Sequence, residues 1–296
     1  MSQNAWAQLE QPLLDLDGVD LSGATRLTYI LRQSFRYDYD GRAYGLHHRL
    51  LVIPRARRGS LRVHFKQVEV SASGAQVTTR PDAHGNLVTT VRLDVVPQTV
   101  EFRVAAVIER TLSQTGTLLP AGTLQDRRLL CATDLTTADK ALREMAGELR
   151  GVAPGDLDFA QLCCERVNAA IGYEFGVTST STTAAQAYAG GQGVCQDHAH
   201  VMLSLCRSVG VPARYVSGHL LGEGGTHAWV EVVVPEGHQA RAVAFDPCNG
   251  VRTGPRHLTV ATGRDYRDVA PTSGSYRGDA RGHLTTTKYL GITSAA

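Results

Sequence analysis

One short stretch of the sequence carries a residue that could do covalent chemistry. Cys195 follows the glycine turn Gly191–Gly193 and precedes a run of residues with helical spacing. A thiol attacks a carbonyl carbon only as a thiolate, so its free pKa of about 8.5 must be lowered. A helix N-terminus favours the thiolate through its positive dipole end and its free backbone N–H groups. The position of Cys195 therefore favours a nucleophile.

Two later stretches could supply the other groups that such a nucleophile needs. His227 begins one strand-like run and Asp246 ends the next. An imidazole can take the proton of the thiol, and a carboxylate can orient the imidazole. We therefore predict a catalytic triad with Cys195 as nucleophile, His227 as base and Asp246 as orienting acid. Taken alone, Cys195 also fits a buried structural thiol, and the other two fit a hydrogen-bonded pair at strand ends.

The neighbours of these residues are candidates for substrate binding. Gln192 and Gln196 could each provide a second oxyanion donor beside the backbone N–H of Cys195. His198 is expected to be a polar wall of the cleft. Trp229 could shape the substrate groove, although a packing role fits it equally well.

The two histidines after Cys195 also raise the question of a metal site. Residues two apart on a helix point about 200° apart, so His198 and His200 cannot bind one ion together. The six cysteines include no C-x-x-C pair, and a structural zinc site lacks support. We expect neither a metal nor a cofactor, and we expect His200 to be a core histidine bonded to backbone.

Composition excludes several classes of function. Of the 296 residues, 43% are hydrophobic and 20% are charged, as in a soluble globular protein. A net charge of +2 is too small to indicate a nucleic-acid or membrane partner. There is no apolar run of the ~20 residues that a membrane helix needs, and the first residues lack the pattern of a signal peptide. We therefore expect a cytoplasmic protein, whose oligomeric state the sequence does not indicate.

The first part of the chain has the pattern of strands. Runs of β-forming residues recur from Arg26 to Ile108, and residues 61–66 alternate apolar and polar side chains. Strands at such spacing, without helical pattern between them, predict an antiparallel β-sandwich. We place it at residues 26–112, after an N-terminal extension at 1–25.

The second part mixes helical and strand-like patterns. Helical spacing occurs at 137–146, at 158–171 and after Cys195, and three strand-like runs follow from Arg214 onward. This order predicts an α+β domain, which we place at residues 125–290. A long Ser-, Thr- and Gly-rich loop at 174–193 comes directly before Cys195, and such loops are usually functional or mobile.

Four motifs occur together in the order and spacing of a known family: Gly193-Val194-Cys195-Gln196-Asp197, Pro212–Gly218, His227–Glu231 and Phe245-Asp246-Pro247. They resemble the transglutaminase-like superfamily, and more narrowly its bacterial branch of candidate cysteine proteases with an N-terminal β-rich domain. The resemblance runs from about residue 26 to 290. It implies a papain-like α+β core in which the matching residues are nucleophile, base and orienting acid. The chain departs from the family pattern at His198, usually an aromatic residue, and at Cys248, usually threonine.

The expected activity is hydrolysis of an amide bond in a peptide or another amide-containing substrate, through a thioester acyl-enzyme. Two alternatives stay open. The same fold could transfer the acyl group to an amine and so form an amide bond. The chain could also be a non-catalytic peptide- or protein-binding module that has kept the fold.

Overall fold

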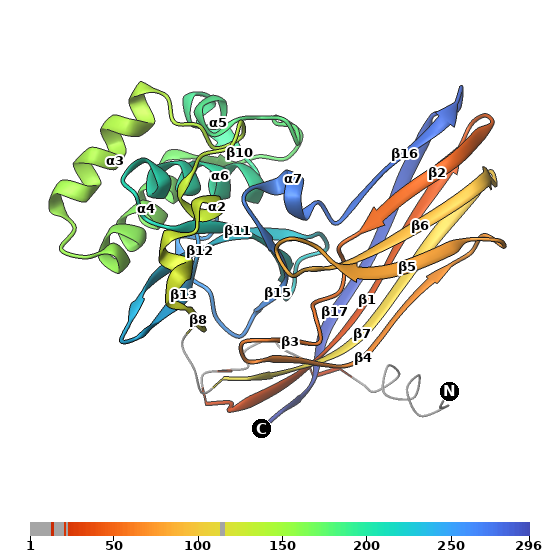
Figure 1. The fold of residues 1–296 in the computed structure, drawn as a ribbon, viewed down its shortest axis with the longest axis horizontal. Helices are drawn as coiled ribbons and strands as arrows, with labels where there is room; N and C mark the ends of the chain where they lie inside the picture. The colour runs from red at the N-terminus through yellow and green to blue at the C-terminus, as the bar shows by residue number, and fades with distance from the viewer. Residues whose placement is uncertain (1–12, 15–20, 22, 113–115) are drawn as a thin grey trace. The chain divides into compact units, whose positions relative to one another are not determined.

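The computed structural model describes residues 13–14, 21, 23–112 and 116–296, and these form two compact units. The first unit takes in the described part of Met1–Gln114 together with His219–Thr226 and Ala270–Ala296. The second takes in the described part of Thr115–Gly218 together with His227–Val269. Both units are therefore discontinuous in sequence (Figure 1).

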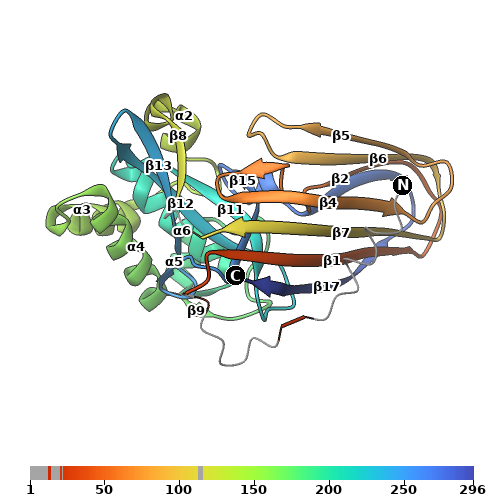
Figure 2. The same cartoon turned by 90° about the horizontal axis from the view of Figure 1, so that it is seen from below.

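The first unit contains two antiparallel sheets. The five-stranded sheet has the order β17-β1-β7-β4-β3, and β17, β1, β7 and β4 lie side by side in Figure 2. Its strands are β1 (Arg26–Tyr39), β3 (Arg57–Arg58), β4 (Leu61–Val70), β7 (Thr99–Thr111) and β17 (Gly282–Ala295). The four-stranded sheet, in the order β16-β2-β6-β5, consists of β2 (Ala43–Leu50), β5 (Gln76–Pro81), β6 (Leu87–Val96) and β16 (Thr272–Gly278).

The two sheets pack face to face through aromatic side chains. Phe102 of β7 stacks on His48 of β2 with ring centroids 4.5 Å apart, and Tyr37 of β1 meets the same histidine edge-on at 5.0 Å. Tyr39 of β1 contacts Tyr276 of β16 at 5.1 Å. Alternate residues of each strand point into this core, as a strand with one buried face requires. The predicted antiparallel sandwich is confirmed.

The ends of the sandwich differ from the predicted domain limits. The sequence placed residues 125–290 in the second domain, but β16 pairs with β2, and β17 pairs with β1 from Leu27 to Tyr39. Residues 270–290 therefore belong to the first unit. The cause is a long-range pairing between the first and last strands, which no local pattern reports. The predicted extension at 1–25 lies almost entirely outside the described residues.

The second unit is built on a six-stranded sheet with the order β14-β13-β12-β11-β15, in which β8 also pairs with β13. Its strands are β8 (Thr117–Pro120), β11 (Ala213–Leu220), β12 (His227–Glu236), β13 (Gln239–Asp246), β14 (Val251–Arg252) and β15 (His257–Gly263). Two short strands, β9 (Gly172–Tyr173) and β10 (Gln192–Gly193), form a separate parallel pair.

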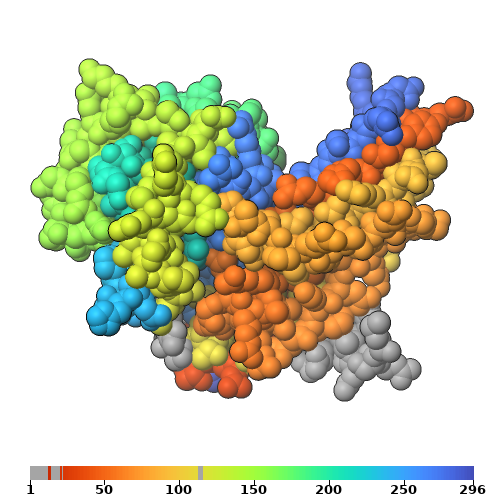
Figure 3. All heavy atoms as spheres, viewed as in Figure 1, coloured from red at the N-terminus to blue at the C-terminus, as the bar shows by residue number. Residues whose placement is uncertain are grey.

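Helices complete the second unit: the 3-10 helix η1 (Ala121–Gln125) and the α-helices α2 (Arg127–Leu130), α3 (Lys140–Val152), α4 (Asp156–Ala170), α5 (Ala184–Gly190), α6 (Cys195–Ser208) and α7 (Tyr266–Val269). Figure 3 shows the yellow-green side chains of η1, α2 and α3 on the outer surface of this unit. Helix α6 is central, because it contacts β12 on one side and α3, α4 and α5 on the others. No helix in the described part of the chain is both long and apolar enough to cross a membrane. Sheets and helices together confirm the predicted α+β core.

A buried arginine fixes the far end of α6. Arg207 donates to the backbone oxygens of Leu129, Ala213 and Arg264 and to the hydroxyl of Thr136. Burial lowers the pKa of its guanidinium to about 10. A buried charge is tolerated only when its donors are satisfied, and this fork joins four segments to the helix.

The C-terminal strand should contribute to the stability of the first unit. Ile292 in β17 is fully buried, so Ile292→Ala should lower the free energy of unfolding by about 3 kcal/mol, the usual cost of removing a buried aliphatic side chain. Leu284 on the same strand is 37% exposed, and Leu284→Ala should cost less than about 1 kcal/mol. Urea denaturation measures both. Equal effects would contradict the pairing of β17 with the core of this unit.

Candidate active site

The turn before α6 is held tightly, so that the helix begins at Cys195. Gly191, with a φ of 66°, ends α5 in the left-handed conformation. The carboxylate of Asp197 accepts a hydrogen bond from the Val194 N–H at 2.8 Å. A Cβ at Gly193 would come within 2.7 Å of Asp197, so this position requires glycine. The half-buried Cys195 is thus fixed at the first turn of the helix.

The same aspartate connects the helix to the preceding loop. The Asp197 side chain is fully buried and also accepts from the Thr178 hydroxyl at 2.6 Å. A buried carboxylate needs such donors, and its negative charge is favourable near a helix N-terminus. One side chain therefore holds the loop, the turn and the first turn of α6 together.

His227 and Asp246 meet in the interior of the second unit. His227 begins β12 and Asp246 ends β13, and these strands are antiparallel neighbours. The Nε2 atom of His227 lies 2.7 Å from Oδ2 of Asp246, and both side chains are almost fully buried. The predicted proximity of the two residues is therefore present in the structure.

Hydrogen bonds converge on the buried carboxylate of Asp246. Its Oδ2 accepts from Nε2 of His227, from Nδ2 of Asn249 at 2.8 Å and from Nε2 of His257 at 3.0 Å. Its Oδ1 accepts from the backbone N–H groups of Cys248 at 3.0 Å and Asn249 at 3.3 Å. Burial alone would raise the pKa of Asp246, but these hydrogen bonds, with that of His227 the largest, hold it well below its usual range.

The electrostatics of His227 follow from its two partners. Burial alone would lower its pKa, but the hydrogen bonds with Asp246 and Cys195 outweigh burial and raise the pKa to about 10. The imidazole is thus a strong proton acceptor.

Sequence reasoning missed His257. Its contact with Asp246 comes from a strand that is not adjacent to β13 in the sheet, and no motif surrounds it in the sequence. The only signal was a histidine at the start of a strand-like run.

The His227, Asp246 and His257 ligand atoms lie within 4.8 Å of one another, so a metal must be considered. Nδ1 of His257 accepts the Gly254 N–H at 3.2 Å, and Nε2 must then carry the proton that faces Asp246. The separations of 2.7 and 3.0 Å from Oδ2 are those of N–H···O hydrogen bonds. An ion would displace these protons and break the hydrogen bonds, so the cluster fits a hydrogen-bond network better than a metal site.

His198 does not line a cleft, and that prediction is corrected. The side chain is 1% exposed, with Nδ1 lying 2.9 Å from the carbonyl oxygen of Val194 and Nε2 lying 2.9 Å from that of Ile171. Because α6 is buried on nearly all sides, a polar residue on it must find partners inside the protein. His198 therefore ties the start of α6 to the end of α4.

Two further side chains are also buried. The Trp229 ring lies 6.0 Å from that of His227 and contacts the His257 ring edge-on at 5.3 Å. Trp229 thus packs against the histidines, which is the packing role that the sequence left open beside a place in the substrate groove. His200 accepts the Tyr266 N–H at Nε2, as expected for a core histidine, and burial lowers its pKa to about 3.

The two candidate oxyanion donors both contact the loop before Cys195. Nε2 of Gln196 donates to the carbonyl oxygen of Ser179 at 3.3 Å, and Nε2 of Gln192 donates to the carboxylate of Glu174. Each amide retains a second N–H. The role of these residues as oxyanion donors stays a prediction.

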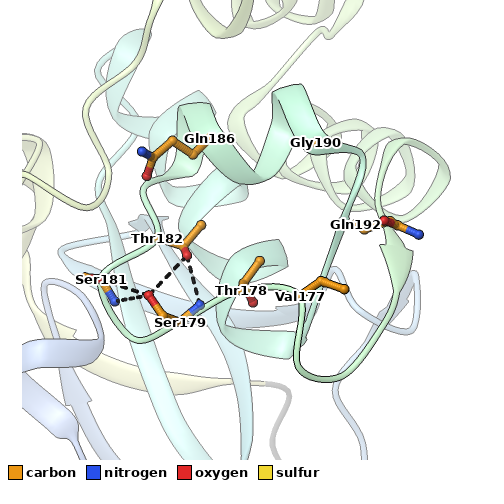
Figure 4. Close-up of a pocket in the computed structure, with 8 residues that line it drawn as sticks. All are labelled: Val177, Thr178, Ser179, Ser181, Thr182, Gln186, Gly190 and Gln192. Atoms are coloured by element: carbon orange, nitrogen blue, oxygen red, sulfur yellow. Dashed lines mark hydrogen bonds between the residues drawn. The ribbon is translucent and has the colours of Figure 1, made fainter.

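A polar pocket of about 450 Å³ lies within this loop region (Figure 4). Its wall is mainly hydroxyl and amide side chains, together with one valine and one glycine: Val177, Thr178, Ser179, Ser181, Thr182, Gln186, Gly190 and Gln192. Hydrogen bonds between Ser179, Ser181 and Thr182 brace one side. Gln192 is the one predicted substrate-binding residue in this wall, and Cys195 is not among the residues that form it.

The charged pair should make stability depend on pH. The folded-state pKa of His227, about 10, lies above its ordinary value of 6.5. Its contribution to the free energy of unfolding is therefore complete below about pH 6.5 and is lost as pH rises toward 10. Urea denaturation across this range should show the decline in the wild type. The His227→Gln variant should lack that component, and parallel curves for the two proteins would contradict the raised pKa.

The sequence itself matches two known families. Residues 143–247 match the transglutaminase-like superfamily, and residues 29–109 match the bacterial transglutaminase-like N-terminal region. The first match includes Cys195, His227 and Asp246, and the second covers most of the sandwich.

Relatives in mycobacteria share part of the chain. An uncharacterised protein of Mycobacterium leprae is 38% identical over 113 residues, which are 35% of this chain and 39% of that protein. One of Mycobacterium tuberculosis is 34% identical over 114 residues, covering 34% of this chain and 36% of its own. The chain thus covers well under two thirds of the length of these relatives.

A solved structure shares the whole architecture. A candidate cysteine protease from Cytophaga hutchinsonii superposes with a TM-score of 0.74 over 91% of each chain, at 18% sequence identity. At that identity the likeness shows the fold. The superfamily match, with a cysteine at the start of α6, supports a cysteine-dependent enzyme. By sequence, residues 143–247 are therefore a transglutaminase-like core and residues 29–109 a bacterial transglutaminase-like N-terminal region, and a solved structure shares their fold.

Proposed function

We propose that the protein is a thiol-dependent hydrolase of amide bonds, acting on a peptide or another amide-containing substrate. One observation carries the proposal: Nε2 of His227 lies 2.7 Å from Oδ2 of buried Asp246. Cys195, at the start of α6, is among the groups that raise the pKa of the same histidine. A carboxylate, an imidazole and a thiol in this order are the parts that nucleophilic acyl transfer needs.

Acylation begins with transfer of the Cys195 proton to His227. The thiolate then attacks the carbonyl carbon of the amide, and a tetrahedral oxyanion forms. The backbone N–H of Cys195 at the helix N-terminus is a suitable donor to that oxyanion, with Gln192 or Gln196 as a second donor. The imidazolium gives its proton to the leaving nitrogen as the C–N bond breaks, leaving a thioester on Cys195.

Deacylation returns the enzyme to its starting state. His227 takes a proton from water, and the hydroxide attacks the thioester carbonyl. The C–S bond breaks, the acid is released, and Cys195 recovers a proton from the imidazolium. Asp246 stabilises the imidazolium in both halves of the cycle and keeps its ring in place.

An amine could take the place of water in the second half. The product would then be a new amide, and the protein would be an acyl transferase. The triad serves both reactions equally, so the choice depends on which nucleophile reaches the thioester. Hydrolysis is favoured here only by analogy of fold, since the superposed Cytophaga hutchinsonii structure is a candidate protease.

A non-catalytic binding module is the remaining alternative. Burying the Asp246 carboxylate and the His227 imidazole costs desolvation free energy. A binding module would have no reason to retain this buried pair in a unit that also holds a half-buried thiol. This argument favours the enzyme.

Alkylation tests whether Cys195 is activated. Near neutral pH, iodoacetamide should modify Cys195 faster than exposed Cys131, because the former can exist as a thiolate paired with His227. Peptide mass mapping measures the rate at each site. The fast phase should vanish in Cys195→Ala and should slow at least about tenfold in His227→Ala. Equal rates at Cys131 and Cys195 in the wild type would support the binding module instead.

Trapping the acyl-enzyme tests the reaction itself. Incubation with a peptide mixture followed by acid quench should leave a thioester adduct on Cys195, detectable by intact mass. Cys195→Ala should carry none, and Asp246→Asn should accumulate it about a hundredfold or more slowly. Products with and without an added primary amine then separate the two reactions. A free acid formed in the presence of amine supports hydrolysis, and a new amide would establish the transferase.

A further inference from the structure

A second histidine donates to the carboxylate that orients the proposed base. His257 stands at the start of β15, and its Nε2 lies 3.0 Å from the same Oδ2 atom that His227 contacts at 2.7 Å. The His257 side chain is 8% exposed, so water competes little for its ring. The two imidazoles thus share one carboxylate oxygen.

The proton positions on His257 follow from its other contact. The Gly254 N–H donates to Nδ1 at 3.2 Å, which makes Nδ1 an acceptor. In the neutral ring the proton must then lie on Nε2, where it is donated to Asp246. A backbone turn therefore sets the tautomer of His257, just as Asp246 sets the ring orientation of His227.

The other side chains around this carboxylate leave it few ways to rotate. Asn249 donates to Oδ2, and the Trp229 ring packs edge-on against His257 at 5.3 Å. The ionisable groups that face Asp246 are His227 on β12, His257 on β15 and Cys164 on α4. Of these, His257 donates from β15, which β12 and β11 separate from β13 in the strand order of the sheet.

We infer that His257 is a positioning residue for the proposed triad, holding the Asp246 carboxylate so that Oδ2 stays aligned with His227. This inference rests on the proposed function. Without the Nε2–H of His257, Asp246 loses one of its charge-assisted hydrogen bonds, and its Oδ2 is held less firmly in line with His227. The His227 imidazolium is then held less well against Cys195, and the thiolate is less stable. His257 contacts no reacting atom and acts only through Asp246.

The test is the pH dependence of iodoacetamide alkylation at Cys195, which needs no known substrate. The alkylation rate falls as the pH is lowered, and we call this fall the acid limb of the profile. In His257→Phe the acid limb should move up by about one pH unit, which is the size expected for the loss of one hydrogen bond to a charged group. At a pH below the limb, the rate should therefore fall about tenfold relative to the wild type. His257→Gln should behave nearly as wild type, because its amide nitrogen is as many bonds from Cα as Nε2 and can still donate to Asp246.

Two further variants separate positioning from general destabilisation. His257→Asn is polar, but its amide is one bond too short to reach Asp246, so it should behave like His257→Phe. His238, exposed in the turn after β12, is a matched control, and His238→Ala should leave the profile unchanged. Thermal unfolding of each variant checks that it is folded. If His257→Phe fails to fold, the comparison of Gln with Asn decides.

The outcomes of this test are distinct. A raised acid limb in the Phe and Asn variants, with recovery in Gln, supports the positioning role. Identical limbs in the wild type, Asn and Gln variants overturn it while leaving the proposed function intact. A wild-type Cys195 no more reactive than Cys131 removes the proposed function itself, and the role of His257 with it.

Discussion

The second unit depends on keeping one carboxylate charged in the protein interior. Asp246 is fully buried, and moving a carboxylate out of water costs several kcal/mol unless its lone pairs are satisfied. The donors come from β12, from β15 and from the turn that follows Asp246 itself. Each of these segments must therefore be in place before the charge is tolerated. This constraint couples the fold of the sheet to the geometry of the proposed triad.

The turn after Asp246 is in turn held by helix α4. Asn168 donates to the carbonyl oxygen of Cys248 at 2.8 Å, and Gly250 adopts a φ of 67° with Asn168 packed against it. A side chain at Gly250 would meet both the strain of that conformation and the amide of Asn168. Helix α4 thus contributes no residue to the triad, but it fixes the turn that presents two backbone N–H groups to Asp246.

The residues of the proposed triad could be proposed from the sequence because they stand at positions that local patterns mark. Cys195 follows a glycine turn and precedes a helix, and His227 and Asp246 lie at the ends of strand-like runs. His257 could not be found in this way, because its role arises from a contact across the sheet. A strand start in the sequence does not tell which carboxylate lies near it.

The corrections have the same physical origin. His198 was expected to face the cleft because it lies three residues after Cys195, but α6 is enclosed by the sheet and three helices. Spacing assigns a residue to a face of a helix and cannot tell how many faces are covered. For Trp229 the sequence left a groove role and a packing role open, and the packing role applies because β12 is buried on both sides along its first eight residues. The last two strands were missed because their partners lie more than two hundred residues earlier.

The order of the chain bears on how the proposed base, His227, is held. The second unit consists of two segments, of which the first ends at Gly218 and the second begins at His227. These two residues pair with each other across β11 and β12. A Cβ at Gly218 would come within 2.4 Å of the Trp229 ring. Glycine is therefore required at this position if Gly218 is to pair with His227 while Trp229 packs against the histidines. His227 is thus fixed through its backbone by β11 and through its ring by Asp246. A histidine constrained both at its backbone and at its ring has little freedom to reorient. The proposed base requires this, because it must face a thiol with one ring nitrogen and a carboxylate with the other.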